Sequence, residues 1–260
     1  MRAAINLDLR NDGAAQRIGV RLENAWYEPF GSETEQRQRI FIQAGDVTGA
    51  WTWSARVGTD GDNIIGSASA FDNATYRKEF FIERDVVETP LGLERGIYST
   101  FAGAAVDIPL DDRNVLTALA GLQEFTGDNE RLHLRGNYIH VLKPELGLSA
   151  QLRGQYFHST EPNELDYFSP RDFVQVLPVL QMRRFAGDWR LLALGGIGLQ
   201  KSTGSQWKQA NYAELSAQSP IGANWTAGAE LIYTNLPGAS ATVGSEYSYL
   251  QTRINIQRRF

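Results

Sequence analysis

Residues 250–260 read LQTRINIQRRF, and in this stretch apolar and polar side chains alternate almost one by one. Successive side chains of a β-strand point to opposite faces, so Leu250, Ile254 and Phe260 share one face. Arg253 and Asn255 lie on the other face. The stretch therefore predicts a strand with one apolar and one polar face, closed by an aromatic residue.

Segments with the same two-residue period recur along the whole chain, for example at 51–57 and 148–156. The expected strands, separated by turn-forming residues, span 2–10, 16–28, 36–45, 50–58, 63–71, 75–85, 96–108, 113–125, 130–142, 145–158, 171–185, 188–200, 206–218, 222–234 and 245–260. The stretches around 115–124, 174–182 and 190–199 are more uniformly apolar, so their faces stay unassigned. The pattern predicts an all-β chain of fifteen strands, many of them longer than the ~5 to 6 residues usual in globular proteins.

The connections between these strands alternate between tight turns and longer loops. Turns such as 72–74 and 143–144 belong to one set, and loops such as 85–95 and 159–170 belong to the other. Barrels of the bacterial outer membrane have short periplasmic turns, longer outer loops and alternate apolar side chains that face lipid. We therefore predict a transmembrane antiparallel up-and-down β-barrel in a single domain that spans residues 1–260.

The expected number of strands is odd, whereas single-chain bacterial barrels have an even number. With Phe260 on the periplasmic side, the first strand would begin on the outer side. We therefore expect a C-terminal fragment of a longer, sixteen-stranded protein, with one strand upstream of Met1. The alternative is a fourteen-stranded barrel in which residues 2–10 take no part.

Composition narrows the classes of function. The 260 residues contain no cysteine, which excludes disulfide scaffolds and thiolate metal sites. The mean hydropathy is −0.33, and no run reaches the ~18 to 20 apolar residues of a membrane helix. The net charge of −5 argues against nucleic-acid binding. No phosphate loop or dinucleotide motif occurs, so we expect no cofactor. A soluble β-sandwich stays open as a different fold.

Two motifs resemble a known family. Residues 81–91 read FIERDVVETPL and lead into 95–98, RGIY, and residues 165–171 read LDYFSPR. They resemble the C-terminal barrels of exopolysaccharide-export porins, the type that serves cellulose and poly-N-acetylglucosamine secretion; related barrels occur in phage-adsorption proteins. The resemblance implies a bacterial outer-membrane pore that exports a polysaccharide chain passively. It also implies partners: a periplasmic tetratricopeptide-repeat domain or synthase complex, and barrel-assembly machinery that recognises the strand ending at Phe260. Arg258 departs from the apolar residue usual two positions before the end.

The polar faces of the strands supply the candidate pore lining. Inward positions are rich in arginine and amides, a pattern that suits a pore whose charges select solute, or a salt-bridge network that braces the wall. The candidate lining residues are Arg21, Arg39, Arg56, Arg77, Arg135, Gln151, Arg153, Arg253 and Asn255. Such a basic lumen would favour a neutral or anionic polymer. A loop constriction or mouth is expected at Glu83, Asp85, Glu88, Tyr167 and Phe168. Outside the lumen, the expected partners are outer-membrane lipid and lipopolysaccharide.

No catalytic or metal site is expected. The three histidines, His133, His140 and His158, lack metal-ligand spacing. His158 and Ser159 are neighbours on one strand and so point to opposite faces, which does not suit a serine nucleophile and its base. A plugged structural or receptor barrel remains the alternative function, and an outer-membrane lipase or protease is a third.

Overall fold

The computed structural model describes residues 2–11, 16–28, 33–220, 225–235 and 248–258. Its strands are β1 (Arg2–Asn11), β2 (Arg17–Tyr27), β3 (Glu35–Thr48), β4 (Trp51–Thr59), β5 (Ile64–Asp72), β6 (Lys78–Val86), β7 (Tyr98–Asp111), β8 (Asn114–Phe125), β9 (Glu130–Lys143), β10 (Leu148–Ser159), β11 (Asp172–Ala186), β12 (Trp189–Ser202), β13 (Lys208–Gln218), β14 (Trp225–Thr234) and β15 (Tyr249–Arg258). The expected contact of Phe260 with assembly machinery lies outside the described residues.

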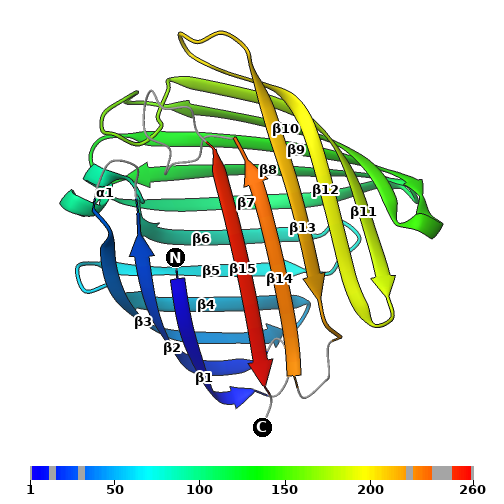
Figure 1. Ribbon diagram of the computed structural model, residues 1–260, viewed down its shortest axis with the longest axis horizontal. Helices are drawn as coiled ribbons and strands as arrows, with labels where there is room; N and C mark the ends of the chain where they lie inside the picture. The colour runs from blue at the N-terminus through cyan, green and yellow to red at the C-terminus, as the bar shows by residue number, and fades with distance from the viewer. Residues whose placement is uncertain (1, 12–15, 29–32, 221–224, 236–247, 259–260) are drawn as a thin grey trace.

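All fifteen strands form one sheet in which every strand pairs antiparallel with the next along the chain. Figure 1 shows how this sheet curls round until its first and last strands reach the same side of the molecule. The prediction of an antiparallel up-and-down β-barrel is therefore confirmed. The alternative of fourteen strands, in which residues 2–10 take no part in the barrel, is wrong. Strand β1 pairs with β2 from Arg2↔Ala25 to Asn11↔Arg17.

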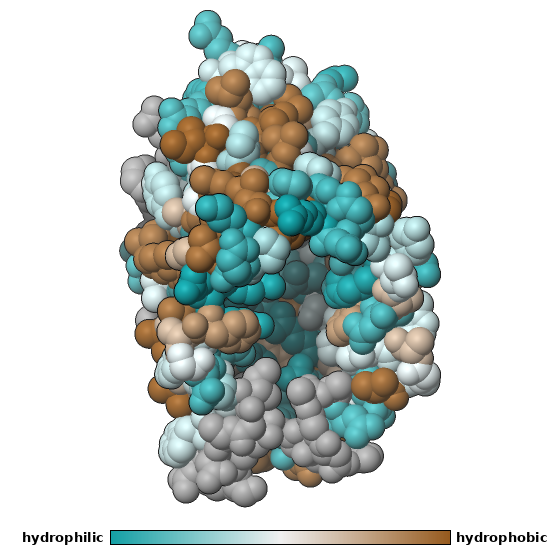
Figure 2. Space-filling model, turned by 90° about the vertical axis from the view of Figure 1, so that its right-hand side faces the viewer, coloured by the Kyte–Doolittle hydropathy of each residue, from teal (hydrophilic) through white to brown (hydrophobic). Residues whose placement is uncertain are grey.

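The two faces of the sheet have opposite chemistry. On β3, Ile40 and Ile42 are 49% and 68% exposed, whereas Arg39 and Gln43 on either side of them are buried. The same inversion continues to the last strand, where Ile254 is 71% exposed. The outer face is therefore apolar and the inner face largely polar, the reverse of a soluble protein that buries its apolar side chains. Figure 2 shows the molecule hollowed, with hydrophilic residues gathered around the hollow.

In the described part of the chain two short helices interrupt the loops and were not expected from the sequence: α1 (Pro90–Arg95) and η1 (Pro144–Leu146). Helix α1 begins because the Thr89 hydroxyl accepts a hydrogen bond from the Gly92 amide and Pro90 has a fixed φ that suits a first helical position. It ends at Gly96, whose φ of 65° is left-handed. No helix of the described residues is long and apolar enough to cross a membrane.

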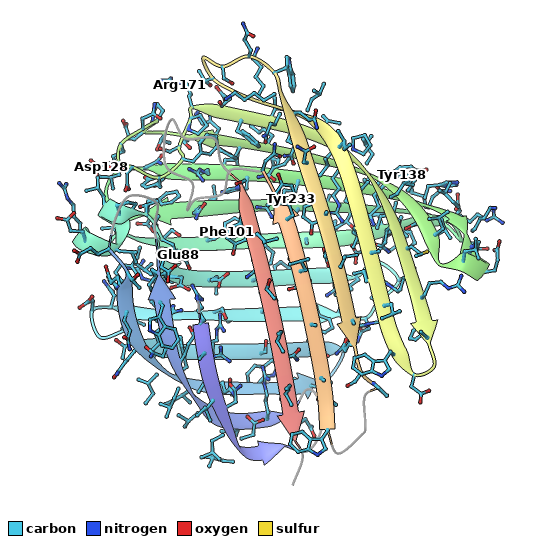
Figure 3. All side chains as sticks on the ribbon, viewed as in Figure 1. Glu88, Phe101, Asp128, Tyr138, Arg171 and Tyr233 are labelled. Carbon is cyan, nitrogen blue, oxygen red and sulfur yellow. The ribbon has the colours of Figure 1, made fainter. Side chains whose placement is uncertain are left out.

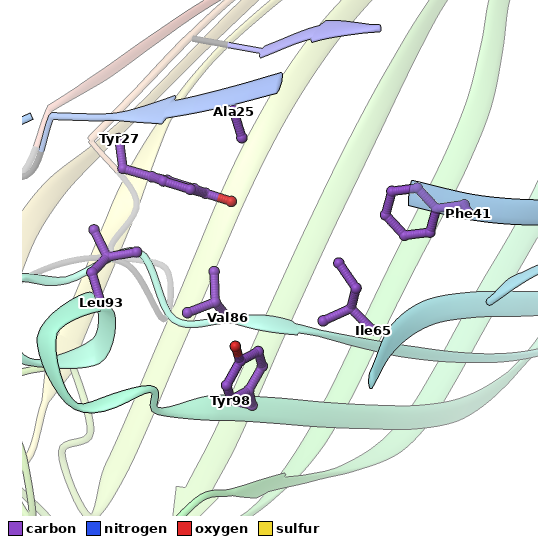
Figure 4. Packing of buried hydrophobic residues seen from close by; sticks show 7 residues of the cluster. All are labelled: Ala25, Tyr27, Phe41, Ile65, Val86, Leu93 and Tyr98. Atoms are coloured by element: carbon purple, nitrogen blue, oxygen red, sulfur yellow. The ribbon is translucent and has the colours of Figure 1, made fainter. Parts of the chain in front are cut away.

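Among the described residues, buried apolar side chains gather in three clusters rather than in one core. The first, drawn in Figure 4, joins strands to helix α1 and consists of Ala25, Tyr27, Phe41, Ile65, Val86, Leu93 and Tyr98. A second cluster packs Val87 and Ile97 against Phe125 and Tyr167. The third contains Leu177, Val179 and Leu194 on β11 and β12. The first two clusters hold the loops against the strands, which shapes one end of the barrel.

Candidate functional site

The strand register shows which side chains share the inner face. One row of paired residues runs Gln43↔Arg56↔Ser67↔Glu83↔Phe101↔Gln123↔Arg131↔Ser159, from β3 to β10. Because Gln43 and Arg131 are both buried, this row belongs to the inner face, and alternate residues along each strand belong with it. The inner face therefore places predicted lining residues of β3 to β10, such as Arg39, Arg56 and Arg153, on one continuous surface.

On β2 to β6 the inner face is held by ion pairs, and we call it the ion-paired wall. Arg39 lies between two carboxylates, with Nη1 at 2.9 Å from Glu23 and Nη2 bonded to Asp85. Arg21 also bonds Glu23, at 2.5 Å. The Arg39 and Glu23 side chains are only 2% and 3% exposed, so their charges compensate each other out of water.

Two further pairs of this wall are more open. Arg56 lies 3.7 Å from Glu83, and their side chains are 36% and 56% exposed. Arg77, just before β6, bonds Glu79 at 2.9 Å and lies 3.5 Å from Asp107. Each of these predicted lining arginines therefore has a carboxylate partner, which neutralises much of its charge.

A hydrogen-bonded corner ties the ion-paired wall to helix α1. Arg37 bonds Asp60 at 3.0 Å and donates to the backbone oxygen of Leu93 at 2.8 Å. The Tyr98 hydroxyl also donates to Asp60, at 2.8 Å. Burial alone would raise the pKa of Asp60, but bonds from the Asn63 amide, Tyr98 and Arg37 outweigh it and hold the pKa below its usual value. Asp60 therefore stays ionised and anchors the corner.

Two outer loops clasp each other across the mouth of the barrel. In the loop after β10, Asp166 accepts hydrogen bonds from the Thr89 hydroxyl at 2.7 Å and from the Leu91 amide at 2.8 Å. Next to it, the Tyr167 ring stacks on Phe125 with centroids 4.3 Å apart. Burial raises the pKa of Tyr167 to about 12, so its hydroxyl stays protonated. The clasp thus joins the α1 loop to the loop of residues 160–171.

The 160–171 loop also rests on the inner face. The Phe168 ring meets Phe157 and Phe173 edge to face, at 6.1 and 5.8 Å. The backbone oxygen of Phe168 accepts a bond from Arg131, whose guanidinium lies 4.5 Å from the Phe157 ring centroid. Since Phe157 and Arg131 belong to the inner face, this loop covers part of the wall near the mouth. Figure 3 places Glu88, Asp128 and Arg171 at this loop end and Tyr138 toward the other end.

The inner face of β8 to β12 lacks acidic side chains, and we call it the carboxylate-free wall. Followed by register, its inner positions include the cations Arg131, Arg135, Arg153, Arg183 and Arg190 and no aspartate or glutamate. All residues of these five strands are described, and none of the five arginines has a carboxylate within 4.0 Å among the described residues. Their neighbours are amides: Gln151 accepts from Arg153 Nε at 3.0 Å and donates to Gln181 at 2.8 Å.

The other predicted lining and mouth residues take the following places. On β15, Arg253 forms an ion pair with Glu230 at 3.1 Å, and Asn255 pairs with Gly228 in the same sheet. Glu83 and Asp85 lie on the inner face of β6, not in a loop. Glu88 is in the α1 loop and bonds Arg2 of β1. The structure thus places Tyr167 and Phe168 in the loop after β10 and Glu83 and Asp85 on a strand of the wall.

Sequence reasoning missed the aromatic residues of the inner face. Phe81, Phe101, His133, Phe157 and Phe173 form a chain of ring contacts across β6 to β11, with centroid distances from 4.9 to 5.7 Å. Apolar residues were expected only on the outer face. The two-residue period could have found them. In β7, Phe101 is an even number of residues from polar Ser99 and Asp107, so it shares their inner face.

No catalytic arrangement assembles around the histidines. His158 Nδ1 bonds Asp172 at 2.9 Å, whereas the Ser159 hydroxyl accepts a bond from Arg131 on the opposite face. The described residues contain no group of histidine, aspartate and glutamate side chains that could hold a metal ion.

Comparison with known proteins gives a likeness in fold. No family model matches the chain, and no curated protein matches it. Among solved structures, one described as "Bacterial polysaccharide outer membrane secretin" superposes with a TM-score of 0.66 at 13% sequence identity. The match covers 100% of this chain and 97% of that one. At this identity the likeness establishes the shared barrel architecture over the whole chain.

Proposed function

We propose that this chain is a bacterial outer-membrane pore through which a polysaccharide is exported passively. The observation that carries the proposal is the inverted sheet, with exposed aliphatic side chains outside and a continuous polar face inside. Each strand of this sheet pairs antiparallel with the next, so the backbone groups between neighbouring strands bond each other, as lipid requires. The likeness to a polysaccharide outer-membrane secretin supports the same location and cargo. Neither a cofactor nor a catalytic group is needed, because synthesis of the polymer drives its movement.

The lining suits a sliding polymer better than a tightly held ligand. Amides such as Gln151, Gln155 and Gln175 can donate and accept hydrogen bonds, and so exchange partners with sugar hydroxyls. The arginines add charge that steers and selects. Conduction requires many weak contacts rather than one strong one, and a wall of repeated polar side chains supplies them.

Single-channel recording tests this proposal. The full chain is reconstituted in planar lipid bilayers, and its insertion is checked by the shift in gel mobility that folded barrels lose on heating. We expect stable, ohmic single-channel currents in potassium chloride. A folded and inserted protein that leaves the bilayer electrically sealed would contradict the export function.

A plugged receptor barrel is the second candidate, and the clasped mouth favours it. The contacts of Asp166 and Phe168 hold a loop over the inner face, as a plug would require. One variant distinguishes the two candidates. Asp166→Ala loosens the clasp, and an open pore should then still conduct, with more frequent fluctuations of its current. A plugged barrel should carry no current as the wild type, and the same substitution should make it conduct.

A further inference from the structure

We propose that the carboxylate-free wall binds the acidic groups of an anionic polysaccharide, so that the cargo is a polymer bearing carboxylates. This inference rests on the proposed export function and names the class of substrate. The contrast within one lumen carries it. On the ion-paired wall four arginines meet a carboxylate of the protein, namely Arg21, Arg39, Arg56 and Arg77, whereas none of the inner-face arginines of β8 to β12 does so among the described residues.

The centre of the proposed site is the pair Arg135 and Arg153. They sit on adjacent strands two residues out of step, because Arg135 pairs with Gln155 and Arg153 pairs with Asn137. Arg153 uses its Nε to bond Gln151, and its guanidinium lies over the Tyr212 ring at 5.1 Å. A guanidinium oriented in this way keeps its outer donors for a planar acceptor, and carboxylate is the acceptor that matches its fork.

Arg135 is still more available. Its side chain is exposed, and among the described residues no hydrogen bond or carboxylate partner is recorded for it. An arginine has five donors that cannot be deprotonated in a protein. An exposed cation that faces a lumen therefore attracts an anion from the solute, since the wall around it offers none.

The residues beside these arginines are neutral or positively charged, so they do not neutralise the guanidinium charges. The row of Arg135 continues as Gln155, Gln175, Gln200 and Lys208 across β10 to β13. With strands ~4.8 Å apart, Arg135 and Lys208 are four strands, or about 19 Å, from each other along this row. The three glutamines between them offer neutral amides for sugar hydroxyls. The row thus combines cations for acidic groups with amides for the rest of a glycan.

Positive charge also extends along the strands from one end to the other. Arg131 lies beneath Phe168 near the mouth, Arg135 and Arg153 lie in the middle, and Arg183 lies near the tight turn where its amide bonds Gly147. A polymer with repeated carboxylates would meet one cation after another. Such a series of separate weak sites allows an anionic chain to advance without being trapped.

Binding and conductance measured side by side test the inference. The probe is hexagalacturonate, an oligomer of a uronic acid, with neutral cellohexaose and cationic glucosamine hexamer for comparison. Equilibrium binding is measured on the folded full chain in detergent, and block of single-channel current is measured in bilayers. The test variant is Arg135→Gln with Arg153→Gln. Its matched control is Arg113→Gln with Lys201→Gln, which changes the net charge equally at a tight turn and on the outer face.

We expect hexagalacturonate to bind best, to bind less as salt rises, and to lose about tenfold in affinity in the test variant, since two exposed cations that would pair with its carboxylates are removed. The control should lose less than about twofold. Equal binding of hexagalacturonate and cellohexaose, or equal losses in the two variants, would overturn the inference. A sealed bilayer with selective binding retained would refute export alone, because the wall would still recognise the acidic oligomer.

Discussion

The two walls of the lumen differ in the burial of their arginines and in the counter-charges around them. On the ion-paired wall, Arg39 has two carboxylate neighbours and is almost fully buried. On the carboxylate-free wall, Arg135 is exposed and has amides for neighbours. A buried guanidinium needs a counter-charge within the protein, whereas an exposed one is hydrated and can bind an anion from solution. The first kind of arginine therefore braces the barrel, and the second kind is available to solute.

Each wall pairs this chemistry with a different kind of mouth contact. The ion-paired wall is tied to the loops by Arg37, which bonds Asp60 and Leu93. The carboxylate-free wall is covered near its outer end by Phe168, through ring contacts and one bond from Arg131. Charge thus fixes one side of the mouth and aromatic packing fixes the other, so salt and pH should affect the two sides unequally.

The largest expected effect comes from removing a buried arginine. Arg39→Met removes the buried cation between Glu23 and Asp85 and leaves them only Arg21 and the partly exposed Arg2. Breaking such a buried pair costs about 3 kcal/mol or more. Unfolding in urea from lipid vesicles measures the loss. Arg135→Met serves as the control on the other wall, where an exposed side chain without a partner should change stability by less than about 0.5 kcal/mol. Equal losses at the two positions would erase the distinction between the walls.

The clasp between the loops should matter less than a buried ion pair. Asp166→Asn keeps the shape of the side chain but removes the charge that accepts bonds from Thr89 and the Leu91 amide. Hydrogen bonds to a charged group contribute about 1.5–3 kcal/mol. The loss should be local, so that limited proteolysis cuts within residues 160–171 faster while the urea midpoint of the barrel stays nearly unchanged. A parallel fall in the urea midpoint would mean that the clasp supports the whole sheet.

Acid should weaken the ion-paired side, and Asp60 reports it. The pKa of Asp60 is lowered in the folded state, so its stabilising contribution is complete above the unfolded value of ~3.9 and is lost as pH falls through the lower folded value. The stability difference between wild type and Asp60→Asn, about 1–2 kcal/mol at neutral pH, should therefore shrink below about pH 4. Heat-dependent gel mobility between pH 8 and pH 3 measures it. A gap that stays constant to pH 3 would contradict the bonded, ionised Asp60.

The architecture was predictable from sequence because a barrel repeats one local signal. In β4, the alternation of residues 51–57 fixed which side chains face outward, and the register agrees at Arg56↔Ser67. The signal failed in β11 and β12, since Leu177, Val179 and Leu194 are apolar on the inner face as well. An apolar cluster on both faces removes the contrast on which a two-residue period depends.

The pairing of the arginines was not predictable, although their inner positions were. A carboxylate partner such as Asp85 for Arg39 lies 46 residues away, across several strands that the sequence does not align. The loop contacts are also non-local, since Asp166 reaches Thr89 over 77 residues. Charge counts alone described a uniformly arginine-rich lumen, and only register divided it into two walls.

The variant with the smallest expected effect on stability tests whether the two walls differ only because one has carboxylates beside its arginines. Glu83→Gln removes the partner of Arg56, and because both side chains are partly exposed, unfolding should change by less than about 1 kcal/mol. Arg56 would then resemble Arg135, an exposed cation beside an amide. We expect the reversal potential in a potassium chloride gradient to move toward anion selectivity, measured on single channels. Glu145→Gln makes the same change of charge at the η1 turn and should leave selectivity unaltered. An unchanged reversal potential in Glu83→Gln would mean that position, rather than the missing carboxylate, makes one wall differ from the other.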